Sequence, residues 1–276
     1  MQKIGLIDFY LDQYHAWTYP QLLKEGSEGN VQVVCAWAKT DHVPGKTNAQ
    51  YSAELGIPLL GSEQEVIDSV DGIIVMSPDN AEMHEELSQG ALASGKPVYV
   101  DKTFSPDRAS AVRMIERAQA FKTPFYTSSA LRYSAEVAEL QGKEISFIAS
   151  RGPGGLETYS IHQVEPLIML MGTDVKRVIS VGETIPLFVI QFADGREATV
   201  SHMPKADFAM SAIVEGKTKE VVVRSDYYKR FIADLVGFFE DARPRVDIAE
   251  TLAIMGTLEA LKAAAKKPFE WVTLTV

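Results

Sequence analysis

The chain has 276 residues, of which 46% are hydrophobic and 23% charged, a balance typical of a globular protein with a substantial core. The formal net charge of −10 argues against a nucleic-acid partner, because a phosphate backbone would be repelled. No apolar run approaches the roughly 20 residues of a membrane-spanning helix, and no charged segment followed by an apolar stretch marks a signal peptide. The single cysteine, Cys35, cannot form an internal disulfide. We therefore expect a cytoplasmic protein without a membrane or nucleic-acid partner.

The first 127 residues alternate short, β-branched apolar runs with amphipathic stretches. Strands are expected at Ile4–Ile7, Val31–Ala38, Gly72–Met76, Val98–Val100 and Phe125–Thr127. Helices are expected at about Trp17–Lys24, Asn48–Leu55, Glu63–Ser69, Met83–Ala93 and Ala109–Phe121. Near-continuous apolar strands between helices indicate a doubly wound parallel sheet covered on both faces. The pattern predicts a Rossmann-type domain over residues 1–127, with ligands bound at the carboxyl ends of its strands.

The pattern changes from residue 128 onwards, where strands outnumber helices. One helix is expected at Ile161–Met171, and two more at Tyr227–Asp241 and Asp247–Lys266. Strands are expected at Arg177–Glu183, Pro186–Phe192, Glu197–His202, Phe208–Glu215, Glu220–Arg224 and Phe269–Leu274. Asp194-Gly195 and Glu215-Gly216 supply hairpin turns between neighbouring strands. Residues 128–276 are therefore predicted to form an α+β domain with an open, mainly antiparallel sheet, for substrate binding and oligomerisation.

One face of this second sheet is expected to remain uncovered by helices. We expect that face to carry Val189, Phe192 and Val200. An apolar face without helices favours burial between subunits, so we predict a homo-oligomer, either a dimer or a tetramer.

The turn after the first strand lacks the glycines that bring a dinucleotide pyrophosphate close to the backbone. Gly5 is followed by Leu-Ile-Asp8-Phe9-Tyr10, and no glycine comes before His15. The second strand ends in Ala38-Lys39, where an acidic residue would hold the ribose hydroxyls. Lys39 would favour a 2′-phosphate or is an ordinary surface lysine. Neither site matches the dinucleotide fingerprint.

A further set of motifs follows in chain order. The segments are Ser77-Pro78, His84, the run Gly-Lys-Pro-Val-Tyr-Val-Asp101-Lys102-Thr103, Arg132-Tyr133, and Gly154-Gly155 before Thr158-Tyr-Ser-Ile-His162-Gln-Val-Glu165. In this order the motifs resemble the Gfo/Idh/MocA family, named for glucose–fructose oxidoreductase and inositol dehydrogenase, over essentially the whole chain. The family carries Thr-Pro, Glu-Lys-Pro and Asp-x-Gly-x-His-x-x-Asp at the matching places. Thr158 therefore stands where the family has Asp, and Ser160 where it has Gly.

The resemblance implies an oxidoreductase that uses NAD or NADP to move hydride to or from a sugar, polyol or related small hydroxy metabolite. It implies that Lys102 polarises the substrate hydroxyl and that His162 exchanges the hydroxyl proton. Thr158, Glu157 and Glu165 are the candidate supporting residues. Phe9, Tyr10, Ala38, Lys39, Ser77, Pro78, His84 and Asp101 are expected near the cofactor, and Arg132, Tyr133 and Tyr159 near the substrate.

A second function remains open, in which the chain is a catalytically impaired family member that binds a small molecule or a protein. The absent glycines, Asp8 in the phosphate turn and Thr158 in place of Asp are the features that favour it. His162 and Glu165 alone supply too few ligands for a metal, so no metal is expected.

Overall fold

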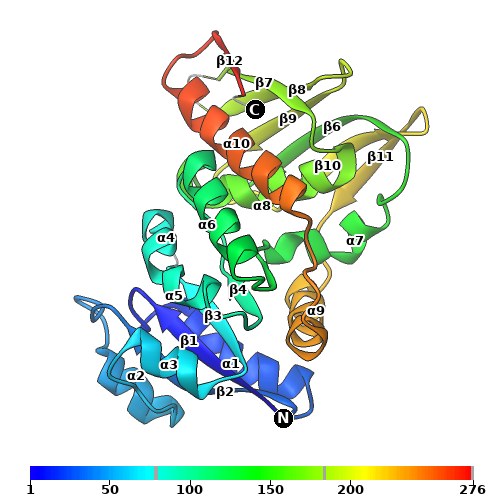
Figure 1. Cartoon of the computed structure of the whole chain (residues 1–276). Coiled ribbons are helices and arrows are strands. Elements are labelled where there is room, and N and C mark those ends of the chain that lie inside the picture. The colour runs from blue at the N-terminus through cyan, green and yellow to red at the C-terminus, as the bar shows by residue number, and fades with distance from the viewer. Residues whose placement is uncertain (78–79, 183–184, 275–276) are drawn as a thin grey trace. The chain divides into compact units, whose positions relative to one another are not determined.

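The computed structural model describes residues 1–77, 80–182 and 185–274, and the chain divides into two compact units (Figure 1). Unit 1 comprises Met1–Ser128 and Lys229–Asp247, and unit 2 comprises Ser129–Tyr228 and Ile248–Val276. The predicted fold class is confirmed, because one sheet is parallel and the other is mainly antiparallel. Among the described residues, no helix combines the length and apolar character needed to cross a membrane.

Unit 1 is built on a parallel sheet with the strand order β2-β1-β3-β4-β5. The strands are β1 (Gln2–Asp8), β2 (Val31–Ala38), β3 (Gly72–Met76), β4 (Val98–Val100) and β5 (Phe125–Tyr126). The strand order reverses between β1 and β3, and such a switch point opens a crevice at the carboxyl ends of the strands. Asp8 ends β1 and Ser77 follows β3, so both lie at the edge where this kind of sheet binds ligands.

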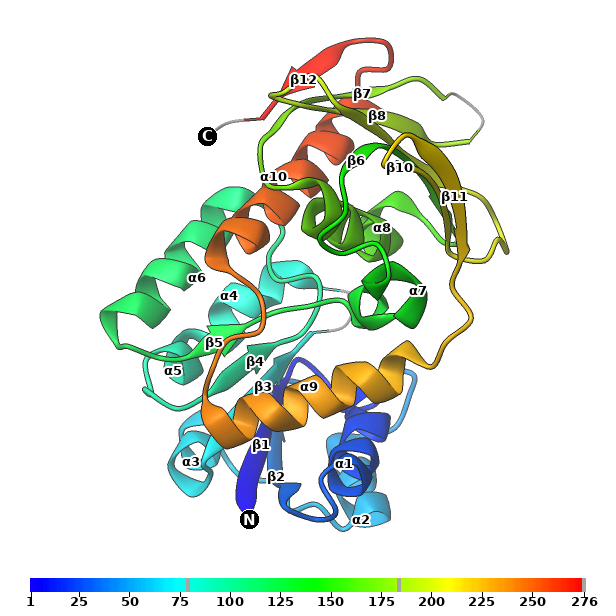
Figure 2. The ribbon, with the colours of Figure 1, turned by 90° about the vertical axis from the view of Figure 1, so that its right-hand side faces the viewer.

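Helices cover both faces of this sheet (Figure 2). They are α1 (Tyr14–Gly26), α2 (Asn48–Leu55), α3 (Glu63–Ser69), α4 (His84–Leu87), α5 (Gln89–Leu92), α6 (Arg108–Ala120) and α9 (Tyr227–Asp241). A Cβ on Gly5 would lie 2.4 Å from Val66 of α3, whereas a Cβ on Gly72 would lie 2.6 Å from Phe239 of α9. These two glycines let α3 and α9 pack directly onto the strands.

One predicted helix of unit 1 is broken in the structure. Instead of a single helix over Met83–Ala93, a short 3₁₀ turn at Ala81–Met83 leads into α4 and then α5. Ser88 lies between α4 and α5, and Gly90 follows at once. Serine and glycine both have low helix propensity, which accounts for the interruption.

Unit 2 is built on a sheet in which the described residues form seven strands, in the order β11-β10-β6-β9-β8-β7-β12. The strands are β6 (Ile145–Gly152), β7 (Val175–Ser180), β8 (Leu187–Phe192), β9 (Glu197–His202), β10 (Ala209–Val214), β11 (Lys217–Val222) and β12 (Trp271–Thr273). The helices are α7 (Ala135–Ala138), α8 (Leu156–Met171) and α10 (Ile248–Ala265). The predicted turns at Asp194-Gly195 and Glu215-Gly216 are confirmed, since each joins an antiparallel pair.

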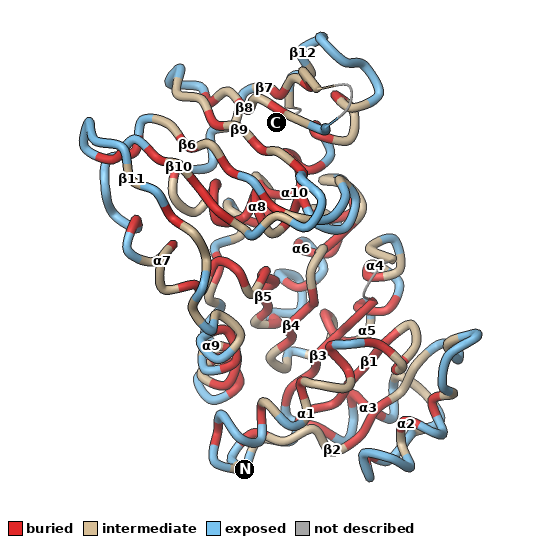
Figure 3. Tube along the Cα trace, turned by 180° about the vertical axis from the view of Figure 1, so that it is seen from behind, coloured by how far each residue is buried: buried red, intermediate tan, exposed pale blue. Residues whose placement is uncertain are grey.

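Successive residues of β8 and β9 alternate between half-exposed and buried (Figure 3). Phe192 is 1% exposed and Val200 is fully buried, so both belong to the core of unit 2. Val189 is half-exposed and lies on the opposite face. The expectation that all three share the uncovered face is wrong, because residues an odd number apart along a strand point to opposite faces.

Candidate active site

In the turn after β1, an acidic side chain accepts hydrogen bonds where a dinucleotide-binding turn would have glycines. The Asp8 carboxyl is fully buried; Oδ1 accepts the backbone N–H of Phe9 at 2.7 Å, and Oδ2 accepts Nε2 of Gln13 at 2.9 Å. Gln13 is the N-cap of α1, where its Oε1 accepts the N–H of His15 at 2.7 Å. Burial raises the pKa of Asp8 to about 8, although the hydrogen bonds from Gln13 and Phe9 partly lower it. These side chains take up backbone N–H groups that a glycine-rich turn would offer to a phosphate.

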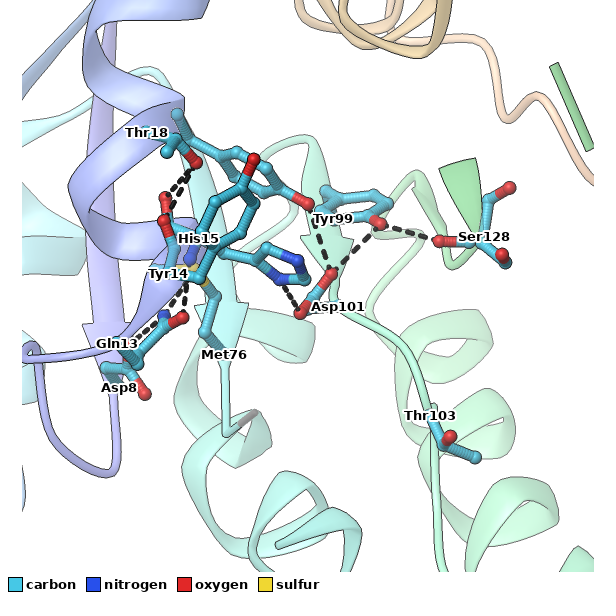
Figure 4. A network of polar contacts seen from close by, with 12 residues as sticks. Asp8, Gln13, Tyr14, His15, Thr18, Met76, Tyr99, Asp101, Thr103 and Ser128 are labelled. Atoms are coloured by element: carbon cyan, nitrogen blue, oxygen red, sulfur yellow. Dashed lines mark hydrogen bonds and ion pairs between the residues drawn. The ribbon is translucent and has the colours of Figure 1, made fainter. Parts of the chain in front are cut away.

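Asp101 and His15 form a second buried cluster at this edge (Figure 4). Nδ1 of His15 lies 2.5 Å from Oδ2 of Asp101, which directly follows β4. The hydroxyls of Tyr19 and Tyr99 each donate to Oδ1 of Asp101 at 3.3 Å. Burial raises the pKa of Asp101, but the charge and hydrogen bond of His15, together with the charges of Lys102 and His84, bring the pKa down to about 2. Asp101 is therefore a buried carboxylate that pairs with His15 and fixes the start of the segment that carries Lys102.

Lys102 lines a cavity of about 350 Å³ in unit 1. Nδ1 of His42 lies 3.1 Å from Oδ2 of Asp12, and the His42 ring stacks on Tyr10 with ring centroids 4.5 Å apart. The cavity thus combines aromatic faces with groups that carry or donate a proton, a composition that suits a polar ligand. The lining residues are Tyr10, Asp12, Gln13, Tyr14, His15, His42 and Lys102.

His84 supports the segment that follows Lys102. It begins α4 and is fully buried, and its Nδ1 lies 2.8 Å from the carbonyl oxygen of Thr103. Burial lowers the pKa of His84, which keeps the ring neutral near pH 7. Ser77 at the end of β3 is buried as well, and Pro78 lies outside the described residues.

The end of β2 carries the residues expected near the ribose. Ala38 is the last residue of the strand and pairs with Asp8 of β1. Lys39 forms an ion pair with Glu86 of α4, and both side chains are exposed. A surface pair of this kind contributes little to stability, so Lys39 can exchange Glu86 for another anion at small cost.

In unit 2, His162 lies on α8 and contacts a serine at the start of the unit. Nδ1 of His162 lies 2.7 Å from Oγ of Ser129. The rings of Tyr159 and Phe208 approach the His162 ring edge-on, with centroids 5.5 Å and 5.7 Å away. His162 is half-buried, and these contacts hold its ring in place.

Glu165 and Arg132 form a buried ion pair next to Ser129, the residue that contacts His162. Oε1 of Glu165 accepts from Arg132 at 3.2 Å, while Oε2 accepts the backbone N–H of Ser129 at 2.7 Å. Arg132 also donates to Glu250 of α10 at 2.8 Å. Glu165 is 2% exposed and Arg132 is 9% exposed. These contacts join α8, α10 and the segment after β5, which favours a supporting role for both side chains.

The other residues expected around His162 are more open. Thr158 and Tyr159 are exposed on the first turns of α8, and Tyr133 is half-buried. Glu157 is exposed and pairs with Lys262 of α10 at 3.1 Å. Ser160, where the family has Gly, is buried with its Oγ 2.9 Å from Nε2 of His202. In the described part of the chain, no group of three or more His, Cys, Asp or Glu side chains is arranged to hold a metal ion.

The structure therefore gathers the predicted residues into two groups, one in each unit. Tyr10 and Lys102 line one cavity in unit 1, and His162 and Glu165 meet around Ser129 in unit 2. Sequence reasoning assigned no role to Ser129 or to the pairing of His15 with Asp101. Nothing in the local sequence marks Ser129 or the pairing of His15 with Asp101.

Solved structures of dehydrogenases share the fold of the whole chain. The myo-inositol dehydrogenase of Lactobacillus casei in complex with NAD(H) and myo-inositol has a TM-score of 0.82 at 12% identity, covering 100% of this chain and 97% of that one. The WlbA dehydrogenase of Bordetella pertussis in complex with NADH and UDP-GlcNAcA has a TM-score of 0.78 at 12% identity, covering 99% of each chain. The myo-inositol 2-dehydrogenase of Lactobacillus plantarum has a TM-score of 0.80 at 14% identity, covering 99% of each chain.

No protein-family model and no curated protein matches the sequence. The identities to the solved structures are low, so the likeness concerns the fold. The fold expected from the motif resemblance is confirmed: the chain has the α/β fold of Gfo/Idh/MocA-type dehydrogenases along its entire length.

Proposed function

We propose that the protein is an NAD(P)-dependent oxidoreductase that moves hydride to or from a hydroxyl-bearing carbon of a sugar, polyol or related small metabolite. The observation that carries the proposal is the likeness of the whole chain to dehydrogenases, including one in complex with NAD(H) and myo-inositol. The motif that contains Lys102 supports it, because Lys102 lines a cavity at the edge where such sheets bind ligands.

The residues at this edge fit part of a dinucleotide. Lys102, His15 and His42 place positive or proton-donating groups in one cavity, where they suit phosphate or carboxamide oxygens. The turn at Asp8 fits less well, because its carboxyl already takes the Phe9 N–H. We therefore propose that side chains of the cavity, more than the β1–α1 turn, hold the cofactor. A bound nicotinamide would supply or accept the hydride.

Lys102 and His162 are the residues proposed to act on the substrate. The ammonium of Lys102 polarises the reacting oxygen and stabilises negative charge that develops on it. His162 takes the hydroxyl proton in the oxidative direction and returns it in the reductive direction. Arg132, Tyr133 and Tyr159 are proposed to shape the substrate side, with Arg132 acting through its pairs with Glu165 and Glu250.

The first test is a titration of the full chain with NADH and with NADPH, followed by nicotinamide fluorescence. We expect saturable binding of at least one of them at submillimolar concentration. Lys102→Ala should weaken this binding about tenfold, equivalent to about 1.4 kcal/mol. Lys24→Ala, which removes an exposed lysine at the end of α1, is the matched control and should leave binding unchanged.

Failure of the folded protein to bind either dinucleotide would contradict the proposal. It would favour the second function, a catalytically impaired relative that binds a small molecule or a protein. The specific observation in favour of that alternative is the turn closed by Asp8 and Gln13. If binding is found, polyols and sugars should be screened for hydride transfer that Lys102→Ala reduces at least about 100-fold.

We also propose that the protein is a homo-oligomer, a dimer or tetramer formed through the uncovered face of the unit 2 sheet. Val189 and Ile179 pair across β8 and β7 and are half-exposed there. Ile213 of β10 is 37% exposed. Light scattering at micromolar concentration should give at least twice the mass of the 30.4 kDa chain. A monomer that persists at higher concentration would contradict this proposal.

A cytoplasmic location is proposed on the chemistry of the single cysteine. Cys35 is buried in β2, and burial raises the pKa of its thiol, so it suits a reducing compartment and an unreactive core role. Fractionation of cells that express the tagged full chain would test the location.

A further inference from the structure

The hydroxyl of Ser129 contacts the imidazole of His162 at Nδ1. Its Oγ lies 2.7 Å from Nδ1 of His162, and Ser129 is fully buried. In the family pattern the acidic partner precedes the histidine by one helical turn, at the position of Thr158. Thr158 is exposed, whereas the hydroxyl found at Nδ1 comes from a different segment of unit 2.

Ser129 is itself fixed from two sides. Its backbone N–H donates to Oε2 of Glu165 at 2.7 Å, and Glu165 is anchored by Arg132. Its Oγ also accepts the N–H of Leu131 at 3.3 Å, so the hydroxyl caps the 3₁₀ turn Ala130–Tyr133. A hydroxyl held in this way has a defined position, although it can still turn its hydrogen.

A serine can serve a histidine in both protonation states. When the ring is protonated, Nδ1–H donates to Oγ; when Nδ1 is bare, the hydroxyl donates to it. Either way the hydrogen bond stays at Nδ1 and the ring keeps its orientation. The hydroxyl adds no charge, in contrast to a carboxylate.

We propose that Ser129 is the positioning residue of His162: its hydroxyl holds the imidazole in one orientation through Nδ1. The contact itself needs no cofactor. Its importance for catalysis rests on the proposed function, in which Nε2 of His162 exchanges the substrate proton.

The test is ¹⁵N NMR of the histidine side chains in the cofactor-free full chain, at one fixed pH. The chain has 5 histidines, and a His162→Gln spectrum identifies the signals of His162 by their loss. The wild-type Nδ1 signal of His162 should carry the shift of a ring nitrogen that is hydrogen-bonded to a hydroxyl. Ser129→Ala should move the Nδ1 signal away from its wild-type position, because that hydroxyl is lost.

Two further variants separate positioning from damage to the fold. Ser134→Ala removes another fully buried serine cap, the one at the start of α7, and should leave the His162 signals unchanged. Ser129→Thr keeps the hydroxyl and should restore the wild-type Nδ1 signal. If Ser129→Ala leaves the His162 signals as they are in a folded protein, or if Ser129→Thr fails to restore them, the proposal is overturned.

Activity gives an independent readout once a substrate is known. Ser129→Ala should lower kcat about tenfold or more, in the range for a misplaced general base, with little change in cofactor affinity. An equal loss in Ser134→Ala would count against positioning. If no substrate is ever turned over, the proposed function fails, while the NMR measurement still decides the role of Ser129.

Discussion

Asp8 is a carboxyl group that unit 1 buries completely at the edge of its sheet. Two N–H donors, from Phe9 and Gln13, hold it, yet burial dominates and raises its pKa from 3.8 to about 8. The folded state therefore binds a proton that the unfolded state releases between about pH 4 and pH 8. The stability contributed by this group is present below pH 4 and is lost as the pH rises to 8.

Replacement of Asp8 by Asn should remove this pH dependence, because Asn cannot ionise. Between pH 5 and pH 9 the free energy of unfolding of Asp8→Asn should rise relative to wild type by on the order of 2–4 kcal/mol. Thermal and urea unfolding over this pH range would measure the difference. The altered hydrogen bond with Gln13 would change the free energy of unfolding by the same amount at every pH. The prediction therefore concerns how the difference between variant and wild type changes with pH.

Asp107→Asn is the matched control for this measurement. Asp107 caps α6 in the same unit, and the hydrogen bond from the Ser110 N–H lowers its pKa. Because Asp107 is already ionised at pH 5, the free energy of unfolding of Asp107→Asn should differ from that of wild type by a constant amount between pH 5 and pH 9. A flat profile for Asp8→Asn as well would mean that Asp8 is ionised throughout.

At the scale of single residues, sequence reasoning located some groups and missed others for a physical reason. Lys102 follows a recognisable strand, so its place at the carboxyl edge could be predicted from the chain order alone. Ser129 and His162 are 33 positions apart, and Asp101 and His15 are 86 apart. Contacts between such distant positions depend on tertiary packing, which local pattern does not encode.

Among the elements, α9 and β3 meet at a glycine that leaves no room for a side chain. A Cβ at Gly72 would lie 2.6 Å and 2.9 Å from two ring atoms of Phe239 and 3.0 Å from Ile4. Gly72→Ala should therefore lower the free energy of unfolding by about 1–3 kcal/mol through overpacking. Urea unfolding would measure the change.

Gly61→Ala provides the comparison for this substitution. Its new Cβ would meet only the flexible carboxylate of Glu65, at 3.3 Å, so the change in stability should stay within about 0.5 kcal/mol. A Gly72→Ala variant as stable as Gly61→Ala would show that α9 can shift to make room.

Strand β6, which sequence analysis missed, shows where pattern recognition fails. Ile145–Gly152 contains Ser146, Ser150 and Arg151 among its apolar residues, and its burial alternates only in part. The strand is nevertheless central: it pairs antiparallel with β10 and parallel with β9. Pairing with a strand on each side compensates for the modest β-strand propensity of these residues. The sequence of β6 alone does not indicate that β9 and β10 will pair with it.

For the whole molecule, the order of elements predicted the fold class because alternating strands and helices admit few arrangements. The pattern gave no indication that the compact units are discontinuous in sequence. Unit 1 takes in residues 229–247, after the chain has completed most of unit 2. Aromatic rings of this late segment pack on rings of residues 1–128. The ring centroid of Phe231 lies 5.9 Å from that of Tyr19 and 5.6 Å from that of Tyr99. The ring centroids of Phe238 and Tyr126 are 4.9 Å apart.

This discontinuity sets an order of events during synthesis on the ribosome. When residue 128 emerges, the aromatic face formed by Tyr19, Tyr99 and Tyr126 has no cover, and it stays bare until the segment with Phe231 and Phe238 has been translated. The β10–β11 hairpin joins neighbouring residues and can form before then. We therefore expect a fragment of residues 1–128 to bind a hydrophobic dye that the full chain excludes.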